Sequence, residues 1–195
     1  MADKEIFLLR HGDTGRPGVY IGSSDICLSP EGTQQVCATG KLLRSQKFDR
    51  VLCSPLLRCR QSWQQLQLDL PLCVDGLLKE VDFGDWEGKS FTEIQGENPE
   101  AVALWINDPH GFSFPGGDSL ADFYRRVHFV YQRLLEDDGK KILLITHGGI
   151  IRHLLCLFLG IPMDKYLLFD IQTGAYSSLA VYSEGSVLTT MNIRG

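Results

Sequence analysis

The chain has 195 residues, of which 44% are hydrophobic and 22% charged, and its formal net charge is −5. This length and composition predict one folded domain, spanning residues 1–195, with a core of its own. The negative charge argues against a nucleic-acid-binding protein, which needs a basic surface. No apolar run approaches the roughly 20 residues that cross a bilayer, and the N-terminus lacks the pattern of a signal peptide, so we expect no membrane association.

The six cysteines are scattered along the chain, without a Cys-x-x-Cys pair and without histidines grouped around them. This arrangement favours neither a disulfide framework nor structural zinc. We therefore predict reduced thiols in a cytoplasmic protein, and chemistry that uses no metal and no cofactor.

The first half of the chain alternates apolar strands with helices, which predicts the βαβ pattern of a parallel sheet. Two serine–proline pairs, Ser29-Pro30 and Ser54-Pro55, mark helix N-termini, because serine caps free N–H groups and proline suits the first turn. In chain order we expect a strand over 6–9, a glycine-rich loop over 12–28, a helix over 30–45, a strand over 51–53, a helix over 56–68 and a strand over 71–74.

The second half begins with a loop over 76–89 and a capping box formed by Ser90 and Glu93. The helical sequence that follows is interrupted at Pro99. Further along we expect a loop over 108–117, an amphipathic helix over 119–136, a strand over 142–145, a helix over 150–159 and a hairpin of strands over 175–182 and 186–192. Together these elements predict an α/β fold of three layers, α/β/α, with a mostly parallel central sheet.

Polar residues of a related kind follow three of the apolar strands. Arg10-His11-Gly12 ends the first strand, Arg58 stands one helical turn after the second, and Thr146-His147-Gly148-Gly149 ends the strand at 142–145. Parallel strands bring these ends to one edge of the sheet, where helix N-termini supply free N–H groups. Arginine forks fit phosphate oxygens, so we predict a pocket for a phosphoryl group.

Such a pocket can carry out phosphoryl transfer if it holds a nucleophile and a proton donor. Either His11 or His147 can attack the phosphorus, while the other histidine and the arginines hold the phosphoryl oxygens. The proton for the leaving group needs a carboxyl on a nearby loop, and Glu80 and Asp82 are the candidates.

These residues lie in motifs that resemble the histidine phosphatase superfamily, also called the phosphoglycerate mutase-like family, over nearly the whole chain. Five motifs stand in the family's order. They are Leu9-Arg10-His11-Gly12, the stretch from Ser54 to Ser62, the stretch from Leu78 to Gly88, Pro115-Gly116-Gly117-Asp118-Ser119, and Thr146-His147-Gly148-Gly149.

The resemblance implies a role for each site residue. His11 is the nucleophile that becomes phosphorylated, His147 is the second histidine of the phosphate pocket, and Arg10 and Arg58 hold the phosphate. Glu80 is the acid and base, although Asp82 or Glu87 could take its place.

The chain also departs from the family pattern. Pro17 stands where the family often has an asparagine, so that phosphate contact must come from elsewhere, and Arg16 or the backbone of Gly22 and Ser23 could supply it. Three further residues differ from those commoner in the family, but none of them is one of the site residues named above; they are Asp13, Cys27 and Asp118.

A structural role is the simpler interpretation of several other residues. His153 lies among apolar residues on a predicted helix, and we expect it to be packed in the core. We expect His110 and His128 at the surface, and Arg60 and Arg152 to be solvated helix charges. The aromatic residues could be core or could line a leaving-group site; they are Phe83, Trp86, Trp105, Phe112, Phe114 and Tyr124.

The predicted function is that of a metal-independent phosphomonoesterase acting on a small molecule, as a monomer or homodimer. The short chain and the Phe83-to-Gly88 loop look most like α-ribazole phosphatases of cobalamin synthesis and their broad-specificity relatives. A phosphoglycerate mutase is disfavoured, because residues 85–117 contain six acids and one base, a poor match for a second anionic group. A non-catalytic phosphate-binding protein should lack the nucleophile or the acid, and both are present.

Overall fold

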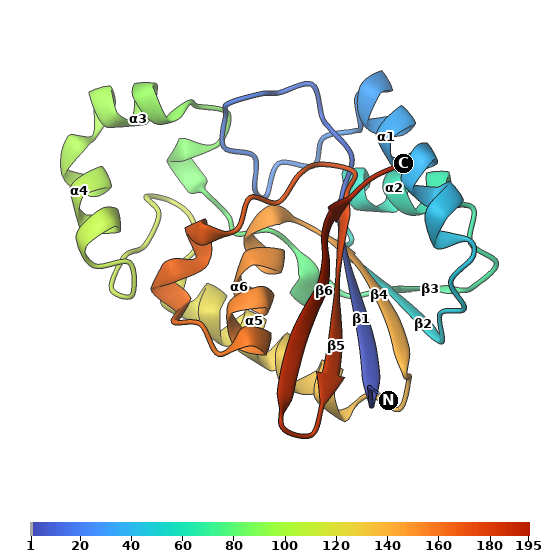
Figure 1. Ribbon diagram of the computed structural model, residues 1–195. Helices are drawn as coiled ribbons and strands as arrows, with labels where there is room; N and C mark the ends of the chain where they lie inside the picture. Colours follow the sequence, from blue (N-terminus) through green and yellow to red (C-terminus); the bar gives the residue numbers. More distant parts are fainter. Residues whose placement is uncertain (1) are drawn as a thin grey trace.

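The computed structural model describes residues 2–195, which fold around one six-stranded sheet with helices on both faces (Figure 1). The strand order is β3-β2-β4-β1-β5-β6. The first four strands in this order run parallel, whereas β5 pairs antiparallel with β1 and with β6. The strands are β1 (Lys4–Arg10), β2 (Arg50–Cys53), β3 (Leu72–Val74), β4 (Lys141–Thr146), β5 (Tyr176–Tyr182) and β6 (Gly185–Ile193). The predicted mostly parallel α/β sheet is confirmed.

Within residues 2–195, six α-helices and three short 3-10 helices connect the strands. The α-helices are α1 (Pro30–Leu43), α2 (Leu57–Leu66), α3 (Phe91–Glu97), α4 (Pro99–Asn107), α5 (Leu120–Glu136) and α6 (Gly148–Leu159), and the 3-10 helices are η1 (Gly76–Leu78), η2 (Gly84–Trp86) and η3 (Met163–Leu168). None of these helices, within residues 2–195, is long and apolar enough to cross a membrane.

Side-chain alternation along the central strands divides the core into two clusters. Ile6 and Leu8 of β1 pack in the cluster that contains α5 and α6 residues, and Phe7 and Leu9 pack in the cluster that contains α1 and α2 residues. Because successive strand residues point to opposite faces, an unbroken apolar run buries both faces of the sheet. Figure 1 shows the resulting layers, with α1 and α2 on one side of the sheet and α5 and α6 on the other.

The strand register brings the polar strand ends together. Arg10 pairs with Thr146 across β1 and β4, and Cys53 pairs with Ile145 across β2 and β4. The ladder continues one residue further, since the His11 N–H donates to Thr146 O (3.0 Å) and the Ser54 N–H donates to Ile145 O (3.0 Å). The residues after all three strands therefore lie at one edge of the sheet, as predicted.

Most helix signals in the sequence are confirmed. Ser29 caps α1 by accepting from the Gly32 N–H, and the Ser90–Glu93 capping box starts α3. Pro99 begins α4, after the predicted break. The loop expected over 76–89 contains the two short 3-10 helices η1 and η2.

The predicted cap of α2 is wrong. The helix begins at Leu57, and its N-cap is Leu56, which has no side-chain capping bond. The hydroxyl of Ser54 lies 2.8 Å from His147 Nε2 instead. Ser54 is therefore hydrogen-bonded to the buried His147. The two residues are 93 positions apart, so local sequence signals do not predict this contact. Helix α6 also begins two residues earlier than expected, at Gly148.

Candidate active site

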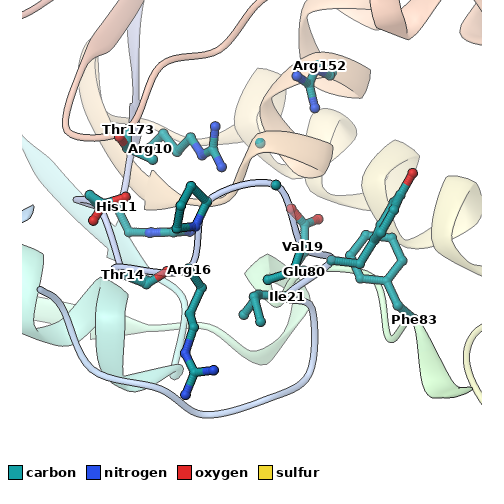
Figure 2. A pocket seen from close by; sticks show the side chains of 15 residues that line it. Arg10, His11, Thr14, Arg16, Val19, Ile21, Glu80, Phe83, Arg152 and Thr173 are labelled. Carbon is teal, nitrogen blue, oxygen red and sulfur yellow. The ribbon is translucent and has the colours of Figure 1, made fainter. Parts of the chain in front are cut away.

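A cavity of about 340 Å³ opens at the carboxyl ends of the parallel strands, the place where ligands bind in open α/β sheets. Arg10, His11, Glu80 and Arg152 line it, together with the loop that follows β1. Figure 2 shows the guanidinium groups of Arg10 and Arg152 reaching the cavity on the same side, with the Glu80 carboxylate facing it. Charged groups from β1, the loop before η2, and α6 thus converge on one space.

His11 presents a nitrogen lone pair to this site. Its Nδ1 lies 2.8 Å from Gly12 O, and since a carbonyl only accepts, we assign the ring proton to Nδ1. Nε2 is then the unprotonated nitrogen, and it accepts a hydrogen bond from Arg58 Nε (3.3 Å). Burial, followed by the charges of Arg10 and Arg58, lowers the pKa of His11 well below its ordinary value. The ring is therefore neutral.

Arg58 is fully buried next to His11. Its Nη1 donates to Ser24 O (2.7 Å) and its Nη2 to Gly22 O (2.7 Å), while Nε donates to His11. A buried guanidinium is tolerated only when its N–H groups find acceptors, and the loop after β1 provides two of them. Arg58 therefore fixes the loop and the His11 ring together.

His147 is the second buried histidine of the site. It is the N-cap of α6, and its ring centroid lies 5.1 Å from that of His11 at an interplanar angle of 60°. Ser54 Oγ lies 2.8 Å from Nε2, and Cys59 Sγ lies 3.5 Å from the same nitrogen. Burial lowers the pKa of His147 well below its ordinary value, with further lowering from His11 and Arg58. The structure therefore brings Arg10, Arg58 and both predicted histidines together.

Arg10 and Arg152 add positive charge near the N-terminus of α6. Arg10 Nη1 donates to Ile171 O (2.6 Å), and Arg152 Nε donates to Phe169 O (2.8 Å). Arg10 Nε is buried without a hydrogen-bond partner among residues 2–195. Two guanidinium groups beside a helix N-terminus make a strong anion site. Our interpretation of Arg152 as a solvated charge is wrong: it stands one helical turn after Gly148, and that spacing places it on the site face of α6.

The structure separates the three candidate proton donors. Glu80 lines the cavity, and its Oε2 accepts from the Gly149 N–H (2.9 Å) in the first turn of α6. Asp82 accepts instead from Ser23 Oγ and the Gly84 N–H. Glu87 accepts from the loop after β1. Glu80 is therefore the one of the three that faces the cavity.

Gly149 is needed for this placement of Glu80. A Cβ atom added at residue 149 would lie 2.4 Å from Glu80 Oε1, closer than van der Waals contact allows. The second glycine of the Thr-His-Gly-Gly motif thus lets the carboxylate approach the helix N-terminus, a requirement that the motif does not reveal by itself.

Gly22 and Ser23 do not line the cavity, although we expected them to contact phosphate there. Both backbone N–H groups donate to Glu87 Oε1, at 2.8 and 2.9 Å. They cannot also replace the missing asparagine contact at Pro17. Arg16 does line the cavity, but its guanidinium points away from Arg10 and Glu80 (Figure 2).

A second, more apolar cavity of about 200 Å³ adjoins the first and shares Tyr20, Glu80, Phe83 and Arg152 with it. Its other aromatic walls include Trp105, Phe114 and Tyr166. The predicted aromatic residues divide accordingly: Trp86, Phe112 and Tyr124 are core, whereas the half-buried Phe83 and Trp105, with the buried Phe114, line this cavity. No group of three or more potential metal-ligating His, Cys, Asp or Glu side chains occurs in the part of the chain that the structure describes.

An anion cavity with a neutral histidine, buried arginines and one facing carboxylate defines a phosphoryl-transfer site on an α/β scaffold. Residues 6–194 match the histidine phosphatase superfamily (branch 1). The chain belongs to this family, and it is a phosphatase that acts on a small phosphate ester.

The chain is similar in sequence to the adenosylcobalamin/α-ribazole phosphatase of Salmonella typhimurium, with 31% identity over 97% of this chain and 96% of that protein. It is 26% identical to phosphoserine phosphatase 1 of Hydrogenobacter thermophilus, over 97% of this chain and 92% of that protein. The crystal structure of the α-ribazole phosphatase from Shigella flexneri has a TM-score of 0.87 to this chain at 29% identity, covering 97% of this chain and 96% of that one.

The ionisation of His11 gives a first test of this site. We expect its ring to stay neutral well below pH 6.5, because burial and two guanidinium charges oppose protonation. In Arg10→Gln, one of those charges is lost, and the pKa of His11 should rise toward its ordinary value. A titration of isotope-labelled histidine by NMR, in the wild type and in Arg10→Gln, measures both. Protonation of wild-type His11 near pH 6.5 would contradict the electrostatic account.

Proposed function

We propose that this phosphatase works through a phosphohistidine on His11. The observation that carries the proposal is the orientation of the His11 ring, whose unprotonated Nε2 lies in a cluster of cations beside the cavity. Arg10 and Arg58 would hold the phosphoryl oxygens, and His147 would donate a further hydrogen bond to them. Arg152 has the charge and position to join this set.

The two half-reactions balance with one carboxyl group. In the first, Arg58 Nε–H exchanges His11 Nε2 for a phosphoryl oxygen as acceptor. His11 Nε2 then bonds to phosphorus, the ester P–O bond breaks, and the proton of Glu80 passes to the leaving oxygen. In the second, Glu80 takes a proton from water, the water oxygen bonds to phosphorus, and the P–N bond breaks to release phosphate. Cations around the phosphoryl group stabilise its charge in both steps.

The adjoining aromatic cavity supports a substrate with a large, flat leaving group. We propose α-ribazole 5′-phosphate, a benzimidazole nucleoside monophosphate, as the physiological substrate, in a step of cobalamin synthesis. Two observations support it: the cavity is walled by aromatic rings, and the relatives at about 30% identity include α-ribazole phosphatases. The unpaired cysteines fit a cytoplasmic location for this step.

Two other substrates fit less well. Phosphoserine is the substrate named for a relative at 26% identity, but its leaving group is small and charged, whereas the neighbouring cavity is largely aromatic. A mutase would have to hold a second anionic group on the substrate, and residues 85–117 carry six acids against one base.

The role of Glu80 can be tested with Glu80→Gln. We expect kcat on alkyl phosphomonoesters to fall by about 10²–10⁴-fold, because the leaving oxygen is no longer protonated. p-Nitrophenolate leaves without a proton, so rapid mixing with p-nitrophenyl phosphate should still give a burst of about one equivalent, followed by slow turnover as water attack fails.

Glu100→Gln, which changes an exposed carboxylate on α4, serves as the control and should keep wild-type rates. Unchanged turnover in Glu80→Gln would assign the proton transfer to another group.

The substrate is tested by comparing kcat/KM in EDTA across α-ribazole 5′-phosphate, phosphoserine, 3-phosphoglycerate and a sugar phosphate. We expect α-ribazole 5′-phosphate to exceed the other three by at least tenfold, and activity to persist with the chelator. A higher value for phosphoserine, or conversion of 3- to 2-phosphoglycerate faster than phosphate release, would overturn the assignment.

A further inference from the structure

His153, a residue in the wall of the aromatic cavity, has a ring nitrogen with no hydrogen-bond partner among residues 2–195. His153 of α6 lines this cavity, and only 2% of its surface is exposed. Its Nδ1 lies 2.7 Å from Gly149 O, and its Nε2 is buried with no hydrogen-bond partner among residues 2–195. The sequence led us to expect a packed core histidine, and the packing is real, but it leaves this nitrogen unsatisfied.

The hydrogen bond to Gly149 determines what the free nitrogen can do. A carbonyl accepts only, so the ring proton belongs on Nδ1 and Nε2 carries a lone pair. Burial lowers the pKa of His153 to about 4, which keeps the ring neutral at physiological pH. His153 is therefore a hydrogen-bond acceptor, and a buried acceptor without a partner is costly.

The ring is held firmly in one orientation. It stacks on Tyr166 with centroids 4.5 Å apart and an interplanar angle of 22°, and it meets the edge of Phe123 at 5.2 Å. The bond to Gly149 fixes its rotation about the side chain. A fixed acceptor surrounded by apolar walls resembles the few polar groups that orient ligands in binding pockets.

His153 is also close to the reacting end of the site. The Gly149 N–H donates to Glu80 Oε2, and the carbonyl of the same residue accepts from His153. Glu80 lines both cavities, whereas His153 lines only the aromatic one. A leaving group that takes its proton from Glu80 and extends into the aromatic cavity thus passes His153.

We propose that His153 Nε2 accepts a hydrogen bond from a hydroxyl or N–H group on the leaving group, and so selects flat substrates that carry such a donor. The inference rests on the proposed phosphatase mechanism and adds a specificity-determining residue to it. A ribose hydroxyl of a nucleoside monophosphate has the required chemistry.

Rigid aryl monophosphates test the inference without reliance on one physiological substrate. The probes are 1-naphthyl phosphate, a series of monophosphates of dihydroxynaphthalenes with the free hydroxyl at different ring positions, and the matching methoxy compounds, which keep the size but lose the donor. For at least one hydroxyl position, we expect kcat/KM to exceed that of the methoxy compound by about tenfold, the effect of one buried hydrogen bond.

His153→Leu should abolish this preference while kcat/KM for 1-naphthyl phosphate stays within about twofold of wild type. His153→Gln, which keeps an acceptor, should retain part of the preference. Tyr124→Phe is the matched control. The Tyr124 ring lies 5.0 Å from that of His153 in a tilted arrangement, and its buried hydroxyl also has no partner among residues 2–195, but Tyr124 does not line the cavity. It should keep the full preference. Thermal unfolding of each variant verifies its fold.

The outcomes separate the inference from the proposed function. A preference that survives in His153→Leu, or that is absent from the wild type, overturns the role of His153. An equal loss on all aryl phosphates in His153→Leu also overturns it, because a structural role would have that effect. If the wild type hydrolyses aryl phosphates with the predicted preference but not α-ribazole 5′-phosphate, the role of His153 stands and the proposed physiological substrate is wrong.

Discussion

The burial of Arg58 is the constraint on which the site depends. A guanidinium that is fully buried must have acceptors for its N–H groups, and here they are His11 Nε2 and the carbonyls of Gly22 and Ser24. The long loop after β1 is therefore tied to α2 at the same point where the ring of His11, the proposed nucleophile, is oriented. The Glu87 carboxylate accepts hydrogen bonds from the backbone N–H groups of Gly22 and Ser23 in the same loop. Two charged side chains therefore hold this loop: Arg58 binds its carbonyl oxygens, and Glu87 binds its N–H groups.

Burial, followed by the charges of Arg10 and Arg58, lowers the pKa of His11. Parallel pairing of β1 with β4 places His11 beside His147 and the N-terminus of α6, where burial and guanidinium charges keep the imidazole neutral. Gly149 links this centre to His153, because its N–H donates to Glu80 and its carbonyl accepts from His153. One helix turn thus positions both Glu80, the proposed acid for the leaving oxygen, and His153, the proposed acceptor for the rest of the leaving group.

The sequence predicted the parts of this structure that follow from local patterns and from strand ends. The apolar runs at β1 and β4, and the polar residues after them, were enough to place His11 and His147 at one edge of the sheet. The sequence did not predict that Gly22 and Ser23 would donate to Glu87, or that the Ser54 hydroxyl would contact His147, because these contacts join residues 65, 64 and 93 positions apart. Arg152 was missed for a different reason: its spacing from Gly148 was visible, but a helix arginine is usually solvated.

The most direct test of the account is to find the phosphoryl group on the enzyme. Wild-type protein mixed with p-nitrophenyl phosphate and quenched in base within milliseconds should carry one phosphoryl group, stable in base and lost in acid, and peptide mass spectrometry should place it on His11. His11→Ala should carry none and should release no p-nitrophenolate burst. A phosphoryl group on His147, or full turnover by His11→Ala, would contradict the central claim that His11 is the nucleophile.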